Sequence, residues 1–120
     1  MINLTQHEAS IQQEEAGVDE PLSVNKSIIK ELLTFDRIPS QEDIMNRASL
    51  LADIAKRDGA TKAMIGGAPF FMGALEKELM RIGIAPYYAF STRTSQEMTK
   101  DGKITKISVF VHEGFVKGGN

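Results

Sequence analysis

The sequence predicts an α/β fold: a small Rossmann-like domain with a mainly parallel four-stranded sheet that is closed by an antiparallel hairpin. Short apolar segments alternate with longer segments of helical spacing, and this alternation implies right-handed crossovers between parallel strands. The pair Asp101-Gly102 is a typical hairpin turn, which adds one antiparallel strand. Strand order 2-1-3-4 would put helices on both faces of the sheet. Order 1-2-3-4 would put them on one face and leave the other for a partner, and the sequence leaves both orders open.

Four segments have the apolar content of strands. They are residues 2–5, with the strand ending near His7, and residues 61–65, 87–91 and 104–111. In the last segment, alternate residues are better suited to burial, so one face of this strand should be better covered than the other.

Helices are expected between these strands. Ser10 can cap a short helix that continues through Gln13 and stops at Gly17, and residues 27–35 have helical spacing. Ser40, followed by acidic residues, starts a long amphipathic helix that ends at Gly59. Pro69 occupies a first helical position, and the helix it begins ends at Gly83.

Composition limits the function classes. The 120 residues form one α/β domain, residues 1–120, with a frayed tail at 117–120; net charge is −2 and cysteine is absent. Disulfides and thiolate metal sites are therefore excluded, and with two histidines we expect no metal site and no cofactor. No basic patch stands out, which argues against duplex nucleic acid, and no apolar run is long enough to span a membrane. No signal peptide is visible, and we expect a cytoplasmic protein.

The carboxyl ends of parallel strands are where open α/β sheets bind ligands. This rule selects three segments, whose glycines, hydroxyls and guanidinium suit a phosphate or carboxylate beside a helix N-terminus. The candidate ligand-binding residues are Thr5, Gln6 and His7, then Gly66, Gly67, Ala68, Pro69 and Phe70, then Ser91, Thr92, Arg93 and Ser95. We expect Thr5, Gln6, His7, Gly66, Gly67, Ser91 and Arg93 to share one concavity.

Each candidate has a simpler structural explanation. Gly66-Gly67 is neither a dinucleotide fingerprint nor a Walker loop, and a tight strand-to-helix turn would explain it. His7 alone suits a structural hydrogen bond, Arg93 a solvated turn, and Phe70 the core. His112 should lie at the opposite edge of the sheet, away from His7, whereas Lys103 and Lys106 should lie near the strand ends.

Three stretches carry a resemblance: Asn3-Leu4-Thr5-Gln6-His7, Met64 to Phe70, and Ala89-Phe90-Ser91 with Arg93 and Ser95, followed by His112 to Val116. Over nearly the whole chain they resemble a family of small uncharacterised proteins of bacteria, phages and mobile elements. The order of elements is also similar to CARF-type Rossmann-like domains and small ring nucleases, which handle cyclic oligonucleotide signals in antiviral defence. That likeness implies a nucleotide ligand.

We therefore expect a homodimeric domain that binds a small phosphorylated or nucleotide ligand, such as a cyclic oligonucleotide defence signal. One alternative is a metal-independent phosphodiesterase or ring nuclease at the same site, with His7 as acid or base and Arg93 stabilising negative charge. The other is a protein-interaction module without a ligand. The dimer is expected because an uncovered apolar sheet face usually finds a partner.

Overall fold

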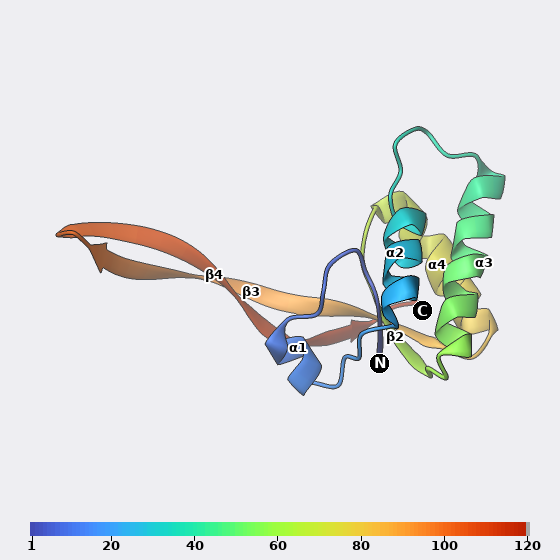
Figure 1. Ribbon diagram of the computed structural model, residues 1–120, viewed down its shortest axis with the longest axis horizontal. Helices are drawn as coiled ribbons and strands as arrows, with labels where there is room; N and C mark the ends of the chain where they lie inside the picture. The colour runs from blue at the N-terminus through green and yellow to red at the C-terminus, as the bar shows by residue number, and fades with distance from the viewer. Residues whose placement is uncertain (120) are drawn as a thin grey trace.

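The computed structural model describes residues 1–119 and contains four helices and four strands in the order β, three helices, β, helix, β, β (Figure 1). The elements are β1 Ile2–Leu4, α1 Ile11–Glu15, α2 Ser23–Leu32, α3 Gln41–Arg57, β2 Lys62–Ile65, α4 Pro69–Arg81, β3 Ala85–Lys100 and β4 Lys103–Lys117.

The sheet order is β1-β2-β3-β4, with β1, β2 and the start of β3 parallel and β4 antiparallel to β3. This confirms the predicted fold class and selects the second of the two strand orders. One face of the sheet packs against the helices, as alternation along the strands requires. Ile2, Leu4, Ala63 and Ile65 join one core with helix side chains, including Leu51, Phe71 and Leu75, all buried.

Local sequence explains where most helices begin. Ser10 and Ser40 cap α1 and α3 by accepting the N–H groups of Gln13 and Asp43, and Pro69 opens α4. The predicted helix at residues 27–35 is displaced: α2 runs from Ser23 to Leu32. Nothing after Pro21 breaks a helix, so α2 begins as soon as the chain has passed that residue.

The sheet face opposite the helices is not bare. The segment from Thr5 to Pro21 leaves the top of β1, turns back and descends along this face before α2 begins (Figure 1). Asn3 and Met64, which point to this face, are only 2% and 3% exposed. Asp19 pairs in parallel with Ile2 and so closes the free edge of β1. The face expected to remain open for a partner is therefore covered over β1 and β2.

β3 and β4 are much longer than predicted, and beyond the sheet they form a two-stranded hairpin arm, defined here as residues 91–112. The strands pair from Tyr87–Lys117 to Lys100–Lys103, with one irregularity at Phe90/Ser91. The arm projects from the body, giving a molecule of 56 × 32 × 31 Å (Figure 1). Asp101 and Gly102 make the predicted turn with φ of 52° and 75°, as a two-residue hairpin loop requires.

The arm corrects three predictions. The segment from Ser91 to Ser95 is not a strand-end loop, because pairing with β4 continues the strand after β2 has ended. His112 is not at the far edge of the sheet: it pairs with Ser91 at the base of the arm. Lys103 and Lys106 lie toward the arm's tip and not near the ends of the parallel strands.

The predicted frayed tail begins at the last residue of β4. Lys117 belongs to β4, and the Gly118 N–H donates to the Pro86 carbonyl at 2.9 Å. Asn120 lies outside the described residues. Within residues 1–119, no helix combines the length and apolar character needed to cross a membrane.

Candidate functional site

A cavity of about 520 Å³ lies at the carboxyl ends of β1 and β2, between the chain that follows β1 and the chain that follows β2. We call it the strand-end pocket. Its walls come from the turn after β1, from α1, from the end of β2 with its two glycines, and from β3. The lining residues are Thr5, Gln6, His7, Glu8, Ser10, Gln13, Met64, Ile65, Gly66, Gly67, Tyr88 and Ala89.

Asn3 shapes the turn that forms one wall of the pocket. Its side-chain oxygen accepts the Thr5 N–H at 3.0 Å and the Thr5 hydroxyl at 2.7 Å, and its amide donates to the His7 carbonyl at 2.8 Å. A buried amide must satisfy its donors and acceptors, so this side chain holds the residues after β1 in one conformation. Gln6 is held by a separate hydrogen bond, in which its side-chain amide donates to the Thr34 hydroxyl at 2.9 Å.

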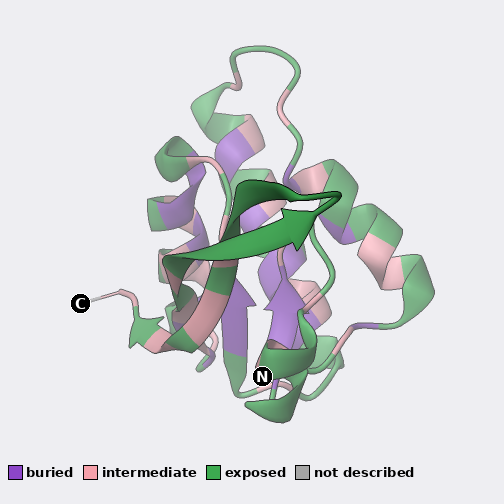
Figure 2. Cartoon of the chain, turned by 90° about the vertical axis from the view of Figure 1, so that its left-hand side faces the viewer, coloured by how far each residue is buried: buried purple, intermediate pink, exposed green. Residues whose placement is uncertain are grey.

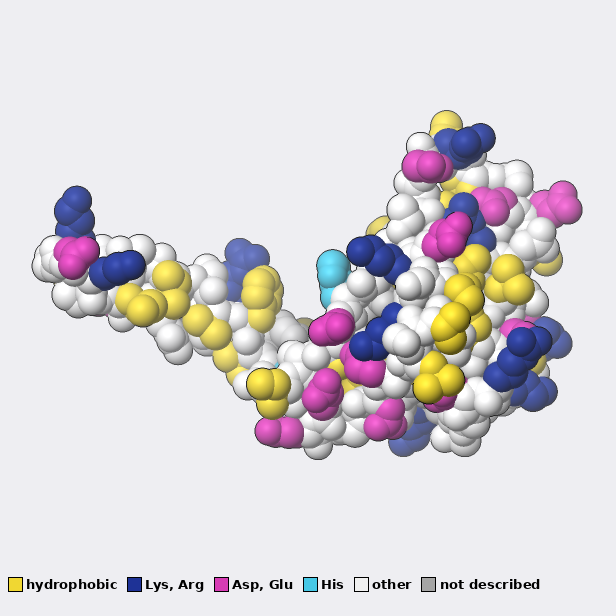
Figure 3. Space-filling view, viewed as in Figure 1, with side chains coloured by type: hydrophobic (Ala, Val, Ile, Leu, Met, Phe, Trp, Pro, Cys, Tyr) yellow, Lys and Arg dark blue, Asp and Glu magenta, His cyan; other side chains and the backbone are white. Residues whose placement is uncertain are grey.

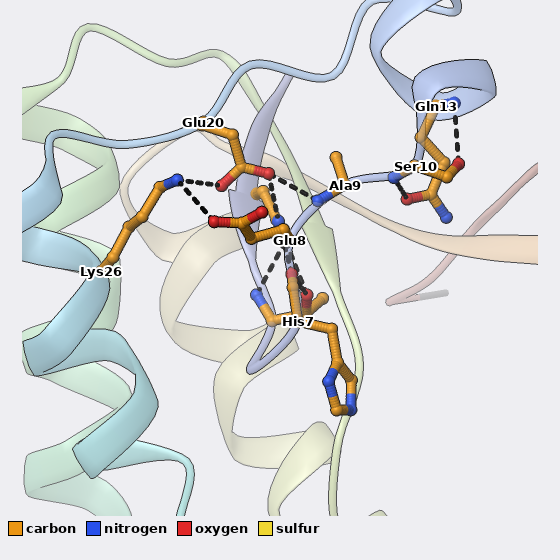
Figure 4. A network of polar contacts seen from close by, with 9 residues as sticks. His7, Glu8, Ala9, Ser10, Gln13, Glu20 and Lys26 are labelled. Atoms are coloured by element: carbon orange, nitrogen blue, oxygen red, sulfur yellow. Dashed lines mark hydrogen bonds and ion pairs between the residues drawn. The ribbon is translucent and has the colours of Figure 1, made fainter.

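A network of charged side chains also stabilises this turn (Figure 4). Glu20 accepts the Asn3 amide at 2.9 Å and the Ala9 N–H at 2.6 Å, and Lys26 lies 3.4 Å from Glu20 and 3.6 Å from Glu8. Burial pushes the pKa of Glu20 upward, but the hydrogen bonds from Ala9 and Asn3 and the Lys26 ammonium together hold that pKa below its usual value. Glu20 is therefore an ionised structural anchor.

A second, smaller cavity of about 190 Å³ lies on the other side of the turn, against α2. It shares Thr5, Gln6, His7 and Glu8 with the strand-end pocket and adds Lys26 and Lys30 from α2. No ion pair within residues 1–119 involves Lys30. The cations close to the predicted site therefore come from α2.

Gly66 and Gly67 form the wall opposite the turn. Gly67 has φ of +152°, a conformation in which a side chain is strained, and a Cβ there would lie 3.4 Å from the Met72 Cε. Gly66 has space, since its nearest neighbour would be the Thr5 Cγ2 at 3.8 Å. α4 begins directly after this wall, with Ala68 at the N-cap and no side-chain cap. Pro69 has no N–H, and the Phe71 N–H donates to the Ala68 carbonyl at 2.9 Å, so of the first three helical residues only Phe70 has an N–H without a backbone partner among the described residues.

The structure brings together part of the predicted site. Thr5, Gln6, His7, Gly66 and Gly67 line one pocket, as expected. The remaining candidates lie elsewhere. Ala68 and Pro69 start α4, Phe70 packs edge-on against Phe35 at 4.9 Å, and Ser91, Thr92, Arg93 and Ser95 belong to the hairpin arm.

The expectation that Ser91 and Arg93 share the concavity is wrong. Neither residue lines the strand-end pocket, and the Arg93 guanidinium lies over the Phe110 ring, 4.9 Å from its centroid. Ser91 and Arg93 pair with His112 and Phe110 on β4. The pocket therefore lacks the guanidinium on which the strongest anion contact depended.

The two histidines differ in their surroundings. The His7 ring is exposed at the pocket and makes no hydrogen bond within residues 1–119. The His112 ring packs edge-on against Phe115 at 4.9 Å, and its backbone N–H donates to the Gln12 side chain at 3.0 Å. A general base must lie within hydrogen-bond reach of the proton it removes, and the exposed His7 ring borders the strand-end pocket.

Sequence reasoning missed Asn3, Glu20 and Lys26, the residues that hold the turn in place. The role of Asn3 could have been predicted, because it is a polar residue between two apolar residues of a buried strand. Such a residue must find hydrogen-bond partners, and the nearest are at the end of its own strand. Glu20 and Lys26 carried no comparable signal, because their contacts join segments distant in sequence.

Comparison with known proteins yields one family. The model of the family described as "Uncharacterized protein MJ1673 family" matches residues 1–116. No curated protein and no solved structure matches the chain.

Proposed function

The chain belongs to the uncharacterized MJ1673 family, and we propose that it is a binding domain for a small phosphorylated or nucleotide ligand that occupies the strand-end pocket. One observation carries the proposal. The turn from Thr5 to Glu8 and the Gly66-Gly67 wall, about sixty residues apart in sequence, face one cavity at the carboxyl ends of parallel strands. This is the position at which open α/β sheets bind ligands.

The size and the accessible backbone of the pocket favour a small ligand that carries a phosphate. A volume of about 520 Å³ falls within the usual range for small-molecule sites. The phosphate belongs at the glycine wall, which lines the pocket and directly precedes the N-terminus of α4, the positive end of that helix. The polar part belongs beside Thr5 and His7. A cyclic oligonucleotide signal stays one form of this hypothesis.

The ligand should be bound without being transformed. His7 is the one histidine among the described residues that line the pocket, and the neighbouring Glu8 is paired with Lys26. We propose that the binding unit is a homodimer and that it works in the cytoplasm, as the sequence predicts. The cysteine-free composition is consistent with that location.

A titration panel tests the proposal. Purified protein is titrated calorimetrically with inorganic phosphate, AMP, a cyclic dinucleotide and a cyclic tetranucleotide, and each compound is recovered and analysed by chromatography. We expect saturable binding of at least one nucleotide, recovered unchanged. Absence of binding across the panel by folded protein contradicts the proposal, and a new product peak would replace binding with catalysis.

Two matched glycine variants locate the site. Gly66→Leu projects a side chain toward Thr5 and into the pocket, whereas Gly73→Leu adds the same side chain on an exposed position of α4 with open space around it. We expect Gly66→Leu to weaken nucleotide binding at least about tenfold and Gly73→Leu to leave it unchanged. Equal affinities would place the ligand outside the strand-end pocket.

A further inference from the structure

The hairpin arm exposes apolar side chains along its length, far from the protein's own core. Met98, Ile104, Ile107 and Phe110 are 37–70% exposed. A two-stranded hairpin with no third layer is marginally stable in water, and exposed apolar side chains on such a ribbon signal a partner. Figure 2 shows the contrast: the arm is exposed, while the strands of the body are buried.

The apolar side chains are not evenly divided between the two faces of the arm. Cross-strand partners and alternate residues share a face. The register therefore places Met98, Ile107, Val109 and Val111 on one face, with Lys100 and Lys103 at its tip. We call this the valine face. The opposite face holds Ile104 and Phe110 among polar and charged residues.

Charge separates the arm from the body. Residues 91–112 hold four cationic and two acidic side chains, a net charge of +2, whereas the rest of the chain holds ten cationic and fourteen acidic ones, a net charge of −4. Figure 3 shows cationic side chains together with acidic ones at the arm's tip, hydrophobic side chains along it and carboxylates gathered where it joins the body. Two sets of carboxylates lie at this base. Glu113 accepts the Thr92 hydroxyl at 2.8 Å, and α1, which holds Glu14 and Glu15, contacts the arm through Gln12.

We infer that the arms of two copies of this chain pack valine face to valine face, antiparallel, about a twofold axis. In this arrangement Ile107 of one copy lies over Val109 of the other, both on β4, and Met98 on β3 lies over Thr92 and diagonally across from Val111 on β4. The tip lysines of each copy then reach the acidic base of the other arm. The pairing is self-complementary, as an isologous interface requires. The partner is therefore a second copy of this chain, and charge complementarity selects it.

The expected affinity follows from the area available. Ten residue pairs at about 3.4 Å each and two strands about 4.8 Å apart give a face of roughly 340 Å². Two such faces bury about 700 Å² in total, which is below the range of stable interfaces and within that of weak, transient ones, so we expect a dissociation constant no tighter than about micromolar. This inference does not depend on the strand-end pocket being a binding site.

Two isoleucine variants on β4 test the inference. Ile107→Glu puts a charge on the valine face, and Ile104→Glu makes the same change three residues away on the opposite face. In light scattering at about 100 μM, well above a micromolar dissociation constant, we expect wild type and Ile104→Glu to be dimers and Ile107→Glu to be a monomer. Circular dichroism confirms that both variants fold. A monomeric wild type, or equal behaviour of the two variants, overturns the inference.

Cysteine trapping tests the antiparallel arrangement, since the chain has no cysteine of its own. Packed sheets lie about 10 Å apart, which is beyond the reach of a disulfide, so a bismaleimide of about that span joins the cysteines. In a parallel pairing, Met98 of one copy and Val111 of the other would be six residue pairs apart along the arms, or about 20 Å. We expect the reagent to join Met98→Cys and Val111→Cys proteins in a mixture. Thr99→Cys, on the opposite face, replaces Met98→Cys in the control mixture and should not cross-link. Equal cross-linking in the two mixtures contradicts the antiparallel pairing.

Discussion

The body and the hairpin arm differ in how far their side chains are buried. In the body, the helices cover one face of the sheet, the segment from Thr5 to Pro21 covers the other face over β1 and β2, and single side chains such as Phe71 are fully buried. In the arm, no position is buried within one chain. Stability therefore resides in the body, and the arm adds surface at little energetic benefit to its own chain. The exposed arm therefore indicates where a partner binds, whereas the buried body determines how the chain folds and how the strand-end pocket is held.

The sharpest contrast is expected from two phenylalanine truncations. Phe71→Ala removes a side chain that is 0% exposed, whereas Phe110→Ala removes one that is 64% exposed on the arm. We expect the first to lower the free energy of unfolding by about 3–5 kcal/mol and the second to change it by less than about 0.5 kcal/mol. Urea denaturation followed by circular dichroism measures both. A cost above 1 kcal/mol for Phe110 would mean that the arm contributes to the stability of its own chain.

Asn3 tests how the body supports the pocket. Asn3→Ala removes the hydrogen bonds to Thr5 and His7 and leaves buried polar groups without partners. We expect a loss of about 2–3 kcal/mol in unfolding free energy, together with altered chemical shifts for the turn from Thr5 to Glu8. Unchanged shifts for that turn would show that other contacts, such as those of Gln6, suffice to hold it.

The helices of the body were predictable because the apolar residues of each helix recur at the spacing that places them on its buried face. Ser40 and the stripe that includes Ala48 and Leu51 identify α3, and Pro69 identifies α4. The arm was not predictable in the same way. Ser91 to Ser95 contains no apolar residue, so it resembled a loop. The antiparallel register that makes it a strand depends on pairing partners about ten to twenty residues further along the chain.

The sequence predicted the pocket residues only where they directly follow the end of a strand. Thr5, His7 and Gly67 follow strands that stop, and the chain topology brings them together. Arg93 was misplaced because its strand does not stop. Strand order depends on which faces the helices cover, and neither the sequence of a strand nor that of a helix contains that information.

The glycine wall gives an effect of intermediate size. Gly67→Ala forces a side chain into φ of +152°, whereas Gly66→Ala has ordinary space and no positive φ. We expect the first to cost about 1–3 kcal/mol of unfolding free energy and the second to stay within about 0.5 kcal/mol. Thermal and urea denaturation of the two variants compare them directly. Equal costs would mean that the chain relaxes out of the strained conformation.

Acid should weaken the body through Glu20. The pKa of Glu20 is lower in the folded protein than its ordinary value of 4.5. Its contribution to stability is therefore complete above pH 4.5 and is lost as the pH falls below that value toward the folded pKa. We expect Glu20→Gln to flatten this part of the stability profile, measured by urea midpoints between pH 3 and 6. An unchanged profile would assign the acid response to other carboxyl groups.

The smallest effect is expected at Arg93, and it separates the arm from the pocket. Its guanidinium lies over the Phe110 ring at 4.9 Å, on an exposed strand of the arm. An exposed cation–π contact is worth about 0.5–1 kcal/mol at most, and an ordinary surface substitution changes stability by less than about 0.5 kcal/mol. We therefore expect Arg93→Ala to leave urea midpoints nearly unchanged. Because Arg93 does not line the strand-end pocket, nucleotide affinity in the calorimetric titration should also stay the same. A tenfold loss of affinity with unchanged stability would bring the arm to the ligand, which one chain alone does not do, and would place Arg93 of a second copy over the pocket.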